Sequence, residues 1–476
     1  MPKQKRADNI VCMQTPSATV LHLRGAAGMD AIYRKVGWRL LPLLMLCYAV
    51  ACLDRLNLGY AQRQMQASLA FGDAVYAWGA ALFFAGCCLC QLPANLLLEK
   101  IGARKTLLRM MLGWGLASAA AAFVRTPFEL YLLRFAQGVF EAGFYPGVIL
   151  YLTWWYPAAR RARVYAVFGS AALLAAASAG PLSEATLAAL QGAAGMRGWQ
   201  WLLLTQGLPA ALLGVIAYAC LAERPDDAGW LSPFEQLMIE QDLERDEAQL
   251  QAAAPAGQPA DDAPFTAVLA SLLRDRALCL LAAANLLLIG ASYALASWAP
   301  ALVQRWAEQS HMQPGLLAAI PHLAGVAGMI AIGYDSDRRR ERRGHFVACM
   351  VLAAGGLALA IAANNGMAWS LAGLALASLG IASAAPLLIA IATDLLSRRR
   401  AAAGIALVVS CGLAGGAFGP ALGARMQAWG GSAATLAVLI AMYLAAGAIL
   451  MLALRLAPRR GGPDAGHGRT DKMARY

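Results

Sequence analysis

Charged side chains are scarce in this sequence. Only 14% of its 476 residues are Asp, Glu, Lys or Arg, and 60% are hydrophobic. Soluble domains carry about 25% charged residues, and a chain this apolar has too little polar surface to stay in water. The scarcity excludes an ordinary soluble protein and indicates that a lipid bilayer surrounds much of the chain.

Catalytic and cofactor-binding patterns are also missing. The five histidines are scattered, whereas an enzyme embedded in the membrane would need clustered histidines and acids. The glycine-rich segment 412–419 lies inside an apolar run without the Lys-Ser/Thr ending of a phosphate loop, so close helix packing explains it better. We expect neither an enzyme nor a bound cofactor.

Cysteine is present, but not in the spacing of a disulfide framework or a zinc site. Nine of the ten cysteines lie inside apolar stretches. The Cys-Cys-Leu-Cys run at 87–90 is better explained by small polarizable packing residues than by a metal or redox motif. The start of the chain lacks a signal-peptide core, so the first hydrophobic segment is expected to be a retained anchor. Met29 is an alternative initiator, with residues 1–28 a disordered tail or untranslated.

Long apolar runs are abundant. A transmembrane helix needs about 20 predominantly apolar residues. Twelve windows meet this requirement: 40–61, 74–98, 106–124, 128–153, 163–186, 199–221, 277–303, 315–334, 345–363, 368–395, 401–425 and 432–456. The sequence therefore predicts an all-α membrane protein with twelve transmembrane helices in two six-helix bundles.

One gap between the windows is long, polar and acidic, and we interpret it as a linker with a short amphipathic helix around 233–251. The predicted organisation is a cytoplasmic N-terminal tail at 1–35, an N-terminal bundle at 36–221, a cytoplasmic linker at 222–270, a C-terminal bundle at 271–456 and a cytoplasmic C-terminal tail at 457–476.

The net charge of +12 comes from short basic clusters between the apolar segments, so no nucleic-acid partner is expected. With the N-terminus inside, the inner regions hold 32 Lys and Arg and the outer loops hold five: Arg63, Arg125, Arg197, Arg305 and Arg425. The positive-inside rule then predicts a bacterial inner-membrane protein with both termini in the cytoplasm.

The two halves repeat with an offset near 238. Segment 95–105 recurs at 333–343, Arg160-Arg161 at 398–399 and Gly180-Pro181 at 419–420, and Pro146 corresponds to Pro386. An offset of six helices preserves orientation, so the repeats are parallel. Such a duplication places a substrate site near the midplane, between the halves.

Segments 95–105 and 333–343 resemble the signature loop of the major facilitator superfamily. Plain positive-inside clusters would explain their arginines, but not the glycine and the acid. The motif places acids and bases at neighbouring helix ends, where pairing with each other and with helix dipoles locks one conformation. The resemblance implies a gating motif made of Glu99, Gly102, Arg104, Asp337 and Arg338.

A finer resemblance covers roughly residues 31–456. Segments 33–36, 53–57, 93–99, 141–147 and 198–201 (YRKV, LDRLN, PANLLLE, EAGFYPG and GWQW) are similar to the anion:cation symporter family. This family carries sugar acids, tartrate, phthalate, nicotinate-type acids, sialate and glutamate. The resemblance implies a proton-coupled importer of a small organic anion, with the proton gradient as its energy source, and we expect a monomer.

Four ionisable residues lie inside predicted helices: Asp54, Arg55, Arg134 and Glu141. A charge at the bilayer centre costs about 2.5–3.5 kcal/mol, so such residues persist where they face a cavity or one another. A purely structural ion pair is the alternative. Positions equivalent to these in the second half carry Ser292-Tyr293, Gly373 and Gly380, and this asymmetry favours a coupling site.

The resemblance implies a role for each charge. Asp54 and Glu141 would take protons, Arg55 would bind the substrate carboxylate, and Arg134, also counted as substrate-binding, would pair with Glu141. Tyr48, Tyr293, Trp298 and Ser410 are further candidates for the cavity wall, although helix packing explains the aromatic residues equally well.

Several positions depart from the family pattern: Cys52, Cys87, Ile389, Val409 and Leu413 stand where family members carry Tyr, Tyr, Trp, Asn and Asn. The second-half wall is therefore less polar, which favours a less hydroxylated substrate such as an aromatic or short aliphatic carboxylate. An exporter or antiporter and a nutrient sensor without transport remain alternatives.

Overall fold

The computed structural model describes residues 18–252, 265–310, 314–363 and 366–456, and within these ranges the chain is helical throughout, without strands. Ten helices are long and apolar enough to cross a membrane. They are α1 (Ala18–Leu69), α2 (Asp73–Ile101), α3 (Ala103–Ala120), α6 (Ala158–Ala189), α7 (Gly198–Cys220), α10 (Arg276–Ser310), α11 (Pro314–Arg339), α12 (Arg343–Ala362), α13 (Met367–Asp394) and α14 (Arg398–Leu456).

The difference between these ten helices and the twelve predicted crossings has two causes, a kink inside one long helix and a break inside one crossing. Helix α14 contains two crossings, because Gly430 and Gly431 leave helical geometry and Gly431 adopts a φ of 68°. The predicted helix at 128–153 is instead divided into α4 (Pro127–Glu141) and α5 (Phe144–Thr153), each too short to span alone.

The break between α4 and α5 has a local cause. Pro146 has no N–H to donate to the carbonyl of Ala142, and its ring crowds that carbonyl. Gly143 stands at the break, where a Cβ atom would lie 2.5 Å from the Cβ of Ala94 on α2. The α4–α5 crossing therefore packs tightly against α2, and Glu141 is the last residue of α4, at the break itself.

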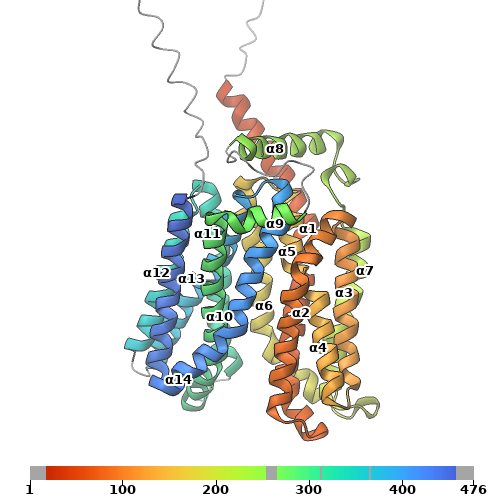
Figure 1. The fold of residues 1–476 in the computed structure, drawn as a ribbon, viewed down its shortest axis with the longest axis vertical. Coiled ribbons are helices and arrows are strands. Elements are labelled where there is room, and N and C mark those ends of the chain that lie inside the picture. Colours follow the sequence, from red (N-terminus) through yellow and green to blue (C-terminus); the bar gives the residue numbers. More distant parts are fainter. Residues whose placement is uncertain (1–17, 253–264, 311–313, 364–365, 457–476) are drawn as a thin grey trace, which may run out of the picture.

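The crossings form two groups that lie side by side in Figure 1, with α1–α7 in one group and α10–α14 in the other. Helix α8 (Pro233–Ala252) lies across one end of the bundle, and we call this end the linker face. Helix α8 confirms that the chain is helical at 233–251, where a short helix was expected.

The tail and linker boundaries differ from the prediction. A second linker helix, α9 (Phe265–Arg274), was not predicted; it buries Val268 and Leu272 against the bundle. Helix α1 begins at Ala18, so residues 18–28 are helical rather than a disordered tail. Residues 1–17 and the predicted C-terminal tail lie outside the described residues.

Candidate functional site

Asp54 of α1 is the most enclosed of the four intramembrane charges, with no exposed surface. One carboxylate oxygen accepts hydrogen bonds from Asn57 Nδ2 at 2.7 Å and from the Ser118 hydroxyl. The other oxygen accepts from Gln137 Nε2 at 2.6 Å. Three neutral donors from α1, α3 and α4 thus hold this carboxylate, and it forms no ion pair with any residue that the structure describes.

Arg134 is connected to Asp54 through Gln137. Its Nη1 donates to Gln137 Oε1 at 2.6 Å, one turn along α4. The guanidinium carbon lies 4.8 Å from the centre of the Phe83 ring of α2, a cation–π contact. Arg134 is 6% exposed, and its Nε has no hydrogen-bonding partner among the described residues.

Glu141 pairs with Arg55 of α1, not with Arg134 as expected. Arg55 Nε donates to Glu141 Oε1 in a close ion pair. The predicted pair was wrong because a shared helix face does not determine where long side chains point. Arg134 turns toward Gln137 and Phe83, which leaves Glu141 to the neighbouring helix.

The pair is exposed on one side only. The Glu141 side chain is wholly buried, whereas the Arg55 side chain keeps 26% of its surface accessible. Among the described residues, the guanidinium makes no hydrogen bond besides the one from Nε. Its two Nη groups are therefore free to receive a carboxylate, while Glu141 occupies the other edge.

Tyr48 and Tyr293 both lie within electrostatic reach of Arg55. Tyr48 stacks on Phe168, with ring centres 4.8 Å apart. Tyr293 of α10, in the repeat position of Arg55, meets Phe84 of α2 edge to face at 6.0 Å. The charged centre of the first half is thus covered by an aromatic residue of the second.

The other two cavity candidates behave differently. Trp298 donates its indole N–H to Gln427 Oε1 at 3.2 Å, which joins α10 to α14 within the second half. Ser410 is half-buried on α14 and makes no side-chain hydrogen bond among the described residues. Neither Trp298 nor Ser410 forms a hydrogen bond with Arg55 among the described residues.

The positions that correspond to Arg134 and Glu141 in the second half are packing glycines. A Cβ on Gly373 would lie 2.6 Å from the Gly356 carbonyl oxygen, and one on Gly380 would lie 2.3 Å from the Cys349 carbonyl oxygen. Helices α12 and α13 touch there backbone to backbone, so no charged side chain fits. The asymmetry of the repeat therefore has a steric basis.

Sequence analysis missed three polar members of the centre: Asn57, Ser118 and Gln137. A usable signal existed for two of them. Asn57 follows Asp54 by three residues, and Gln137 lies between Arg134 and Glu141 at helical spacing, so each shares a face with a charge. Ser118 carries no such signal, because only tertiary packing brings α3 beside α1.

At the linker face, Asp337 of α11 reaches across to the first half. It accepts hydrogen bonds from the backbone N–H groups of Ala162 and Arg163 on α6, at 3.3 and 2.9 Å. Arg342 pairs with it at 3.3 Å. The predicted partner Arg338 is instead exposed and forms no ion pair among the described residues, so Arg342 and Arg163 are the bases of this motif copy.

Arg342 and one further arginine, Arg161, also join the halves at the same face. Arg342 contacts Asp394 and the carbonyl oxygen of Ala158. Arg161 donates to the carbonyl oxygens of Tyr156 and Thr393. Among the described residues, every hydrogen bond and ion pair between the two six-helix groups lies at this face. The structure is therefore a conformation closed at the linker face.

The first copy of the motif is organised around Gly102, which has a φ of 92°. The carboxylate of Glu223 accepts from the backbone N–H groups of Ala103 and Arg104 at 2.7 and 3.1 Å, at the start of α3. A Cβ on Gly102 would lie 2.6 Å from that carboxylate. Arg104 donates to the carbonyl oxygen of Tyr218. Glu99, Arg104 and Glu223 line one surface hollow beside this loop.

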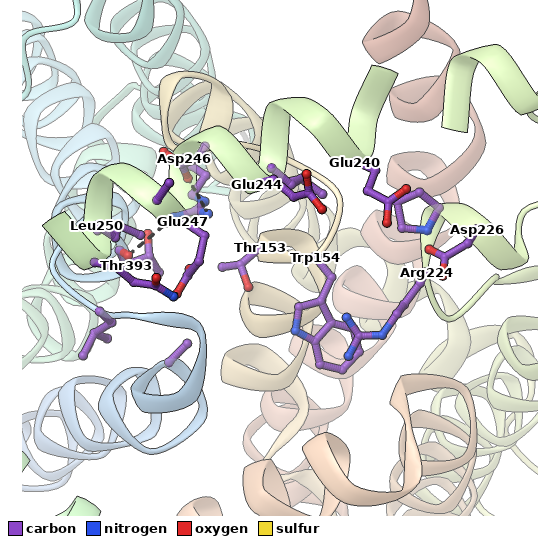
Figure 2. A pocket seen from close by; sticks show the side chains of 17 residues that line it. Thr153, Trp154, Arg224, Asp226, Glu240, Glu244, Asp246, Glu247, Leu250 and Thr393 are labelled. Atoms are coloured by element: carbon purple, nitrogen blue, oxygen red, sulfur yellow. Dashed lines mark hydrogen bonds and ion pairs between the residues drawn. The ribbon is translucent and has the colours of Figure 1, made fainter. Parts of the chain in front are cut away.

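Helix α8 closes the linker face from outside. Asp246 pairs with Arg161 at 3.1 Å and accepts from the Ala158 N–H at 3.0 Å. A hollow of about 340 Å³ lies beneath α8, and Figure 2 shows Glu240, Glu244 and Glu247 lining it. At the other end of α8, a hydrogen bond from Lys35 lowers the pKa of Glu235 below its ordinary value.

Comparisons with known proteins agree with this architecture. The sequence profile described as Major Facilitator Superfamily matches residues 44–343 and 307–472. This chain belongs to the major facilitator superfamily. The proton:xylose symporter XylE has the same fold, with a TM-score of 0.64 at 12% identity over 87% of this chain and 94% of that one.

Three curated relatives are similar over most of their length. A putative tartrate transporter of Agrobacterium vitis is 38% identical over 90% of this chain and 96% of its own. The putative metabolite transport protein NicT of Pseudomonas putida is 35% identical over 84% and 88%. A quinolone resistance transporter of Acinetobacter baumannii is 36% identical over 82% and 87%. This superfamily member is therefore a membrane transporter of organic substrates, not an enzyme.

Proposed function

We propose that this protein is a proton-coupled symporter that imports a small organic carboxylate across a bacterial inner membrane by alternating access. In this proposal the linker face is cytoplasmic, and the conformation described here is the one that receives substrate from outside. The observation that carries the proposal is the double-sided position of Arg55 between a wholly buried Glu141 and accessible space.

The coupling follows from charge balance at Arg55. A substrate carboxylate on the free Nη edge is a second negative charge on one guanidinium, as in bidentate Arg–carboxylate pairs. Glu141 is then less well compensated, so a proton on Glu141 and a substrate on Arg55 favour each other. Such coupling is reciprocal: the proton aids substrate binding as much as substrate aids proton binding.

Asp54 is the second proton site in this scheme. Among the described residues, the donors that hold its carboxylate are all neutral. When Asp54 and Glu141 are both protonated and both arginines are charged, two protons enter with each carboxylate. Each transport cycle then moves one net positive charge inward. The membrane potential then contributes ~2.3 kcal/mol per 100 mV for each net charge.

The substrate class is supported by two further observations. The relatives named putative tartrate transporter and putative metabolite transport protein NicT are identical to this chain at more than a third of the aligned positions. Leu413 of α14, where the family carries Asn, packs against the small cluster of Phe83, Cys87 and Ala142 beside Glu141. An apolar wall at that place favours an aromatic or short aliphatic acid over a polyhydroxylated one.

Export is the second candidate, because one relative is named a quinolone resistance transporter. An exporter of an aromatic acid would use the same Arg55 site with protons moving opposite to substrate. The direction of proton flux during substrate uptake separates the two: symport carries protons inward with the acid, and antiport carries them outward.

The decisive experiment uses Glu141→Gln in proteoliposomes. The variant mimics permanently protonated Glu141, so it should still exchange labelled nicotinate or benzoate in counterflow but fail to accumulate either acid on an inward proton gradient. Glu240→Gln, on α8 and remote from Arg55, is the matched control and should accumulate normally. Gradient-driven accumulation by folded Glu141→Gln protein would overturn the coupling role, whereas failure to fold would favour a structural ion pair.

A further inference from the structure

Helix α2 carries a line of buried polar side chains that the transport site does not use. Cys87, Gln91 and Asn95 follow one another at intervals of four residues and are 3%, 1% and 0% exposed. Residues four apart share one face of a helix. The next position in the series is Glu99, at the linker face, so the line runs from the middle of the helix to its end.

Two oxygens in this line are unpaired. Asn95 Nδ2 donates to the backbone carbonyl of Gln91 at 2.8 Å, but Asn95 Oδ1 and Gln91 Oε1 have no hydrogen-bonding partner among the described residues. A buried acceptor without a partner is destabilising, and leucine of similar shape would avoid the penalty. The two amide oxygens therefore do not stabilise the fold, to which the Asn95 amide contributes one hydrogen bond within α2.

The inner end of the line lies beside Glu141. Cys87 packs in one small cluster with Ala142, the residue after Glu141. Glu141 Oε2, the oxygen not bonded to Arg55, is also buried and unpaired. On the side of α5, Gly147 faces this amide, and a Cβ added there would lie 3.8 Å from Asn95 Oδ1.

We propose that Gln91 and Asn95 form the route by which the Glu141 proton leaves toward the linker face. Water entering from that face donates hydrogen bonds to Gln91 Oε1 and Asn95 Oδ1 and reaches Glu141 Oε2. The carboxylic acid transfers its proton to this water, the proton passes from water to water to the bulk, and Glu141 remains as the carboxylate. The amides orient the water and carry no proton themselves.

This route rests on the proposed symport and is tested with a Gln91→Leu/Asn95→Leu double variant. The double variant loses one hydrogen bond, from Asn95 Nδ2 to the Gln91 carbonyl, but it also removes two buried unpaired oxygens, so the thermal midpoint should change little. Counterflow of labelled nicotinate should stay at the wild-type rate. Proton entry that accompanies uptake, followed with a pH dye inside the liposomes, should fall roughly tenfold or more, because the transfer path loses its hydrogen-bonding sites.

Gln206→Leu is the matched control, because Gln206 is also a buried amide with an unpaired oxygen but lies on α7. It should leave proton entry unchanged. Wild-type proton entry in the double variant, or counterflow and proton entry slowed by the same factor, would overturn the route. Absence of proton entry in the wild-type protein would instead overturn the symport proposal, and the route with it.

Discussion

Arg55 leaves both Nη groups without a partner among the described residues, although its Nε is tied to a buried carboxylate. An intramembrane guanidinium normally has its donors satisfied by protein, because nothing in the lipid core can accept from them. In the proposed symport, this free edge is the side of Arg55 that would face the transported acid.

The Arg55→Lys variant tests whether the free edge of Arg55 binds the transported acid. Lysine keeps the charge but offers a single point rather than a fork, so it cannot hold Glu141 and a substrate carboxylate on separate edges. We expect affinity for the transported acid to fall roughly ten- to a hundredfold, the loss of about one charge-assisted hydrogen bond. Isothermal titration on purified protein measures this.

Arg63→Lys is the control for that measurement, since Arg63 is exposed at the far end of the same helix. It should bind the acid like the wild type. If Arg55→Lys retains wild-type affinity while remaining folded, Arg55 does not contact the substrate.

At the residue scale, the sequence predicted the four charges because each interrupts an apolar run. It could not predict their partners. Arg134 and Glu141 share a face of α4, yet Gln137 and Phe83 take Arg134, and Arg55 of α1 takes Glu141. The reach of a long side chain to a neighbouring helix is decided by helix packing, which has no local signature.

Among the elements, the start of α3 shows how the first signature loop operates. Gly102 has φ 92° and ψ 161°, a region essentially restricted to glycine. That conformation directs the first N–H groups of α3 to Glu223, where the helix dipole favours a negative charge. This part of the loop therefore acts through its backbone conformation, and Glu223 from the linker is its partner.

Gly102→Ala should therefore destabilise the protein. The backbone strain amounts to ~1–3 kcal/mol, and displacement of Glu223 adds the loss of a helix cap. We expect a lower midpoint in a thermal unfolding assay in detergent. Gly59→Ala is the control: no atom lies within 4 Å of its added methyl group, so its midpoint should be unchanged or slightly higher. A Gly102→Ala midpoint equal to wild type would contradict this account of the loop.

The elements also mark where hydropathy is insufficient as a predictor. The window at 128–153 is continuous in composition, but Pro146 and the close approach of α2 divide it into α4 and α5. Helix α9 escaped prediction because ten residues with an apolar face beside a polar linker are too short to read as a crossing. In both cases the length of the segment and the helices packed against it, not its composition, determine where a helix forms and ends.

For the molecule as a whole, orientation in the membrane follows from charge distribution. The linker face carries the basic clusters that follow α2, α5 and α11, and the outer loops hold only five Lys and Arg. We expect alkaline phosphatase fused within the linker or after residue 460 to be inactive and green fluorescent protein at the same places to fluoresce. Active phosphatase at either place would reverse the orientation and make this conformation the one open to the cytoplasm.

The amino-acid sequence alone predicts that the chain lies in a bilayer, crosses it twelve times and contains a parallel repeat. Each of these features depends on local hydropathy, segment length and spacing. The tertiary structure decides which carboxylate pairs with which guanidinium. It also decides which arginines hold the linker face closed and which buried amides remain unpaired. Those contacts join residues far apart in sequence, such as Arg55 with Glu141 and Asp337 with Ala162. Their formation depends on how closely helices approach, and glycines at the contact points set that distance.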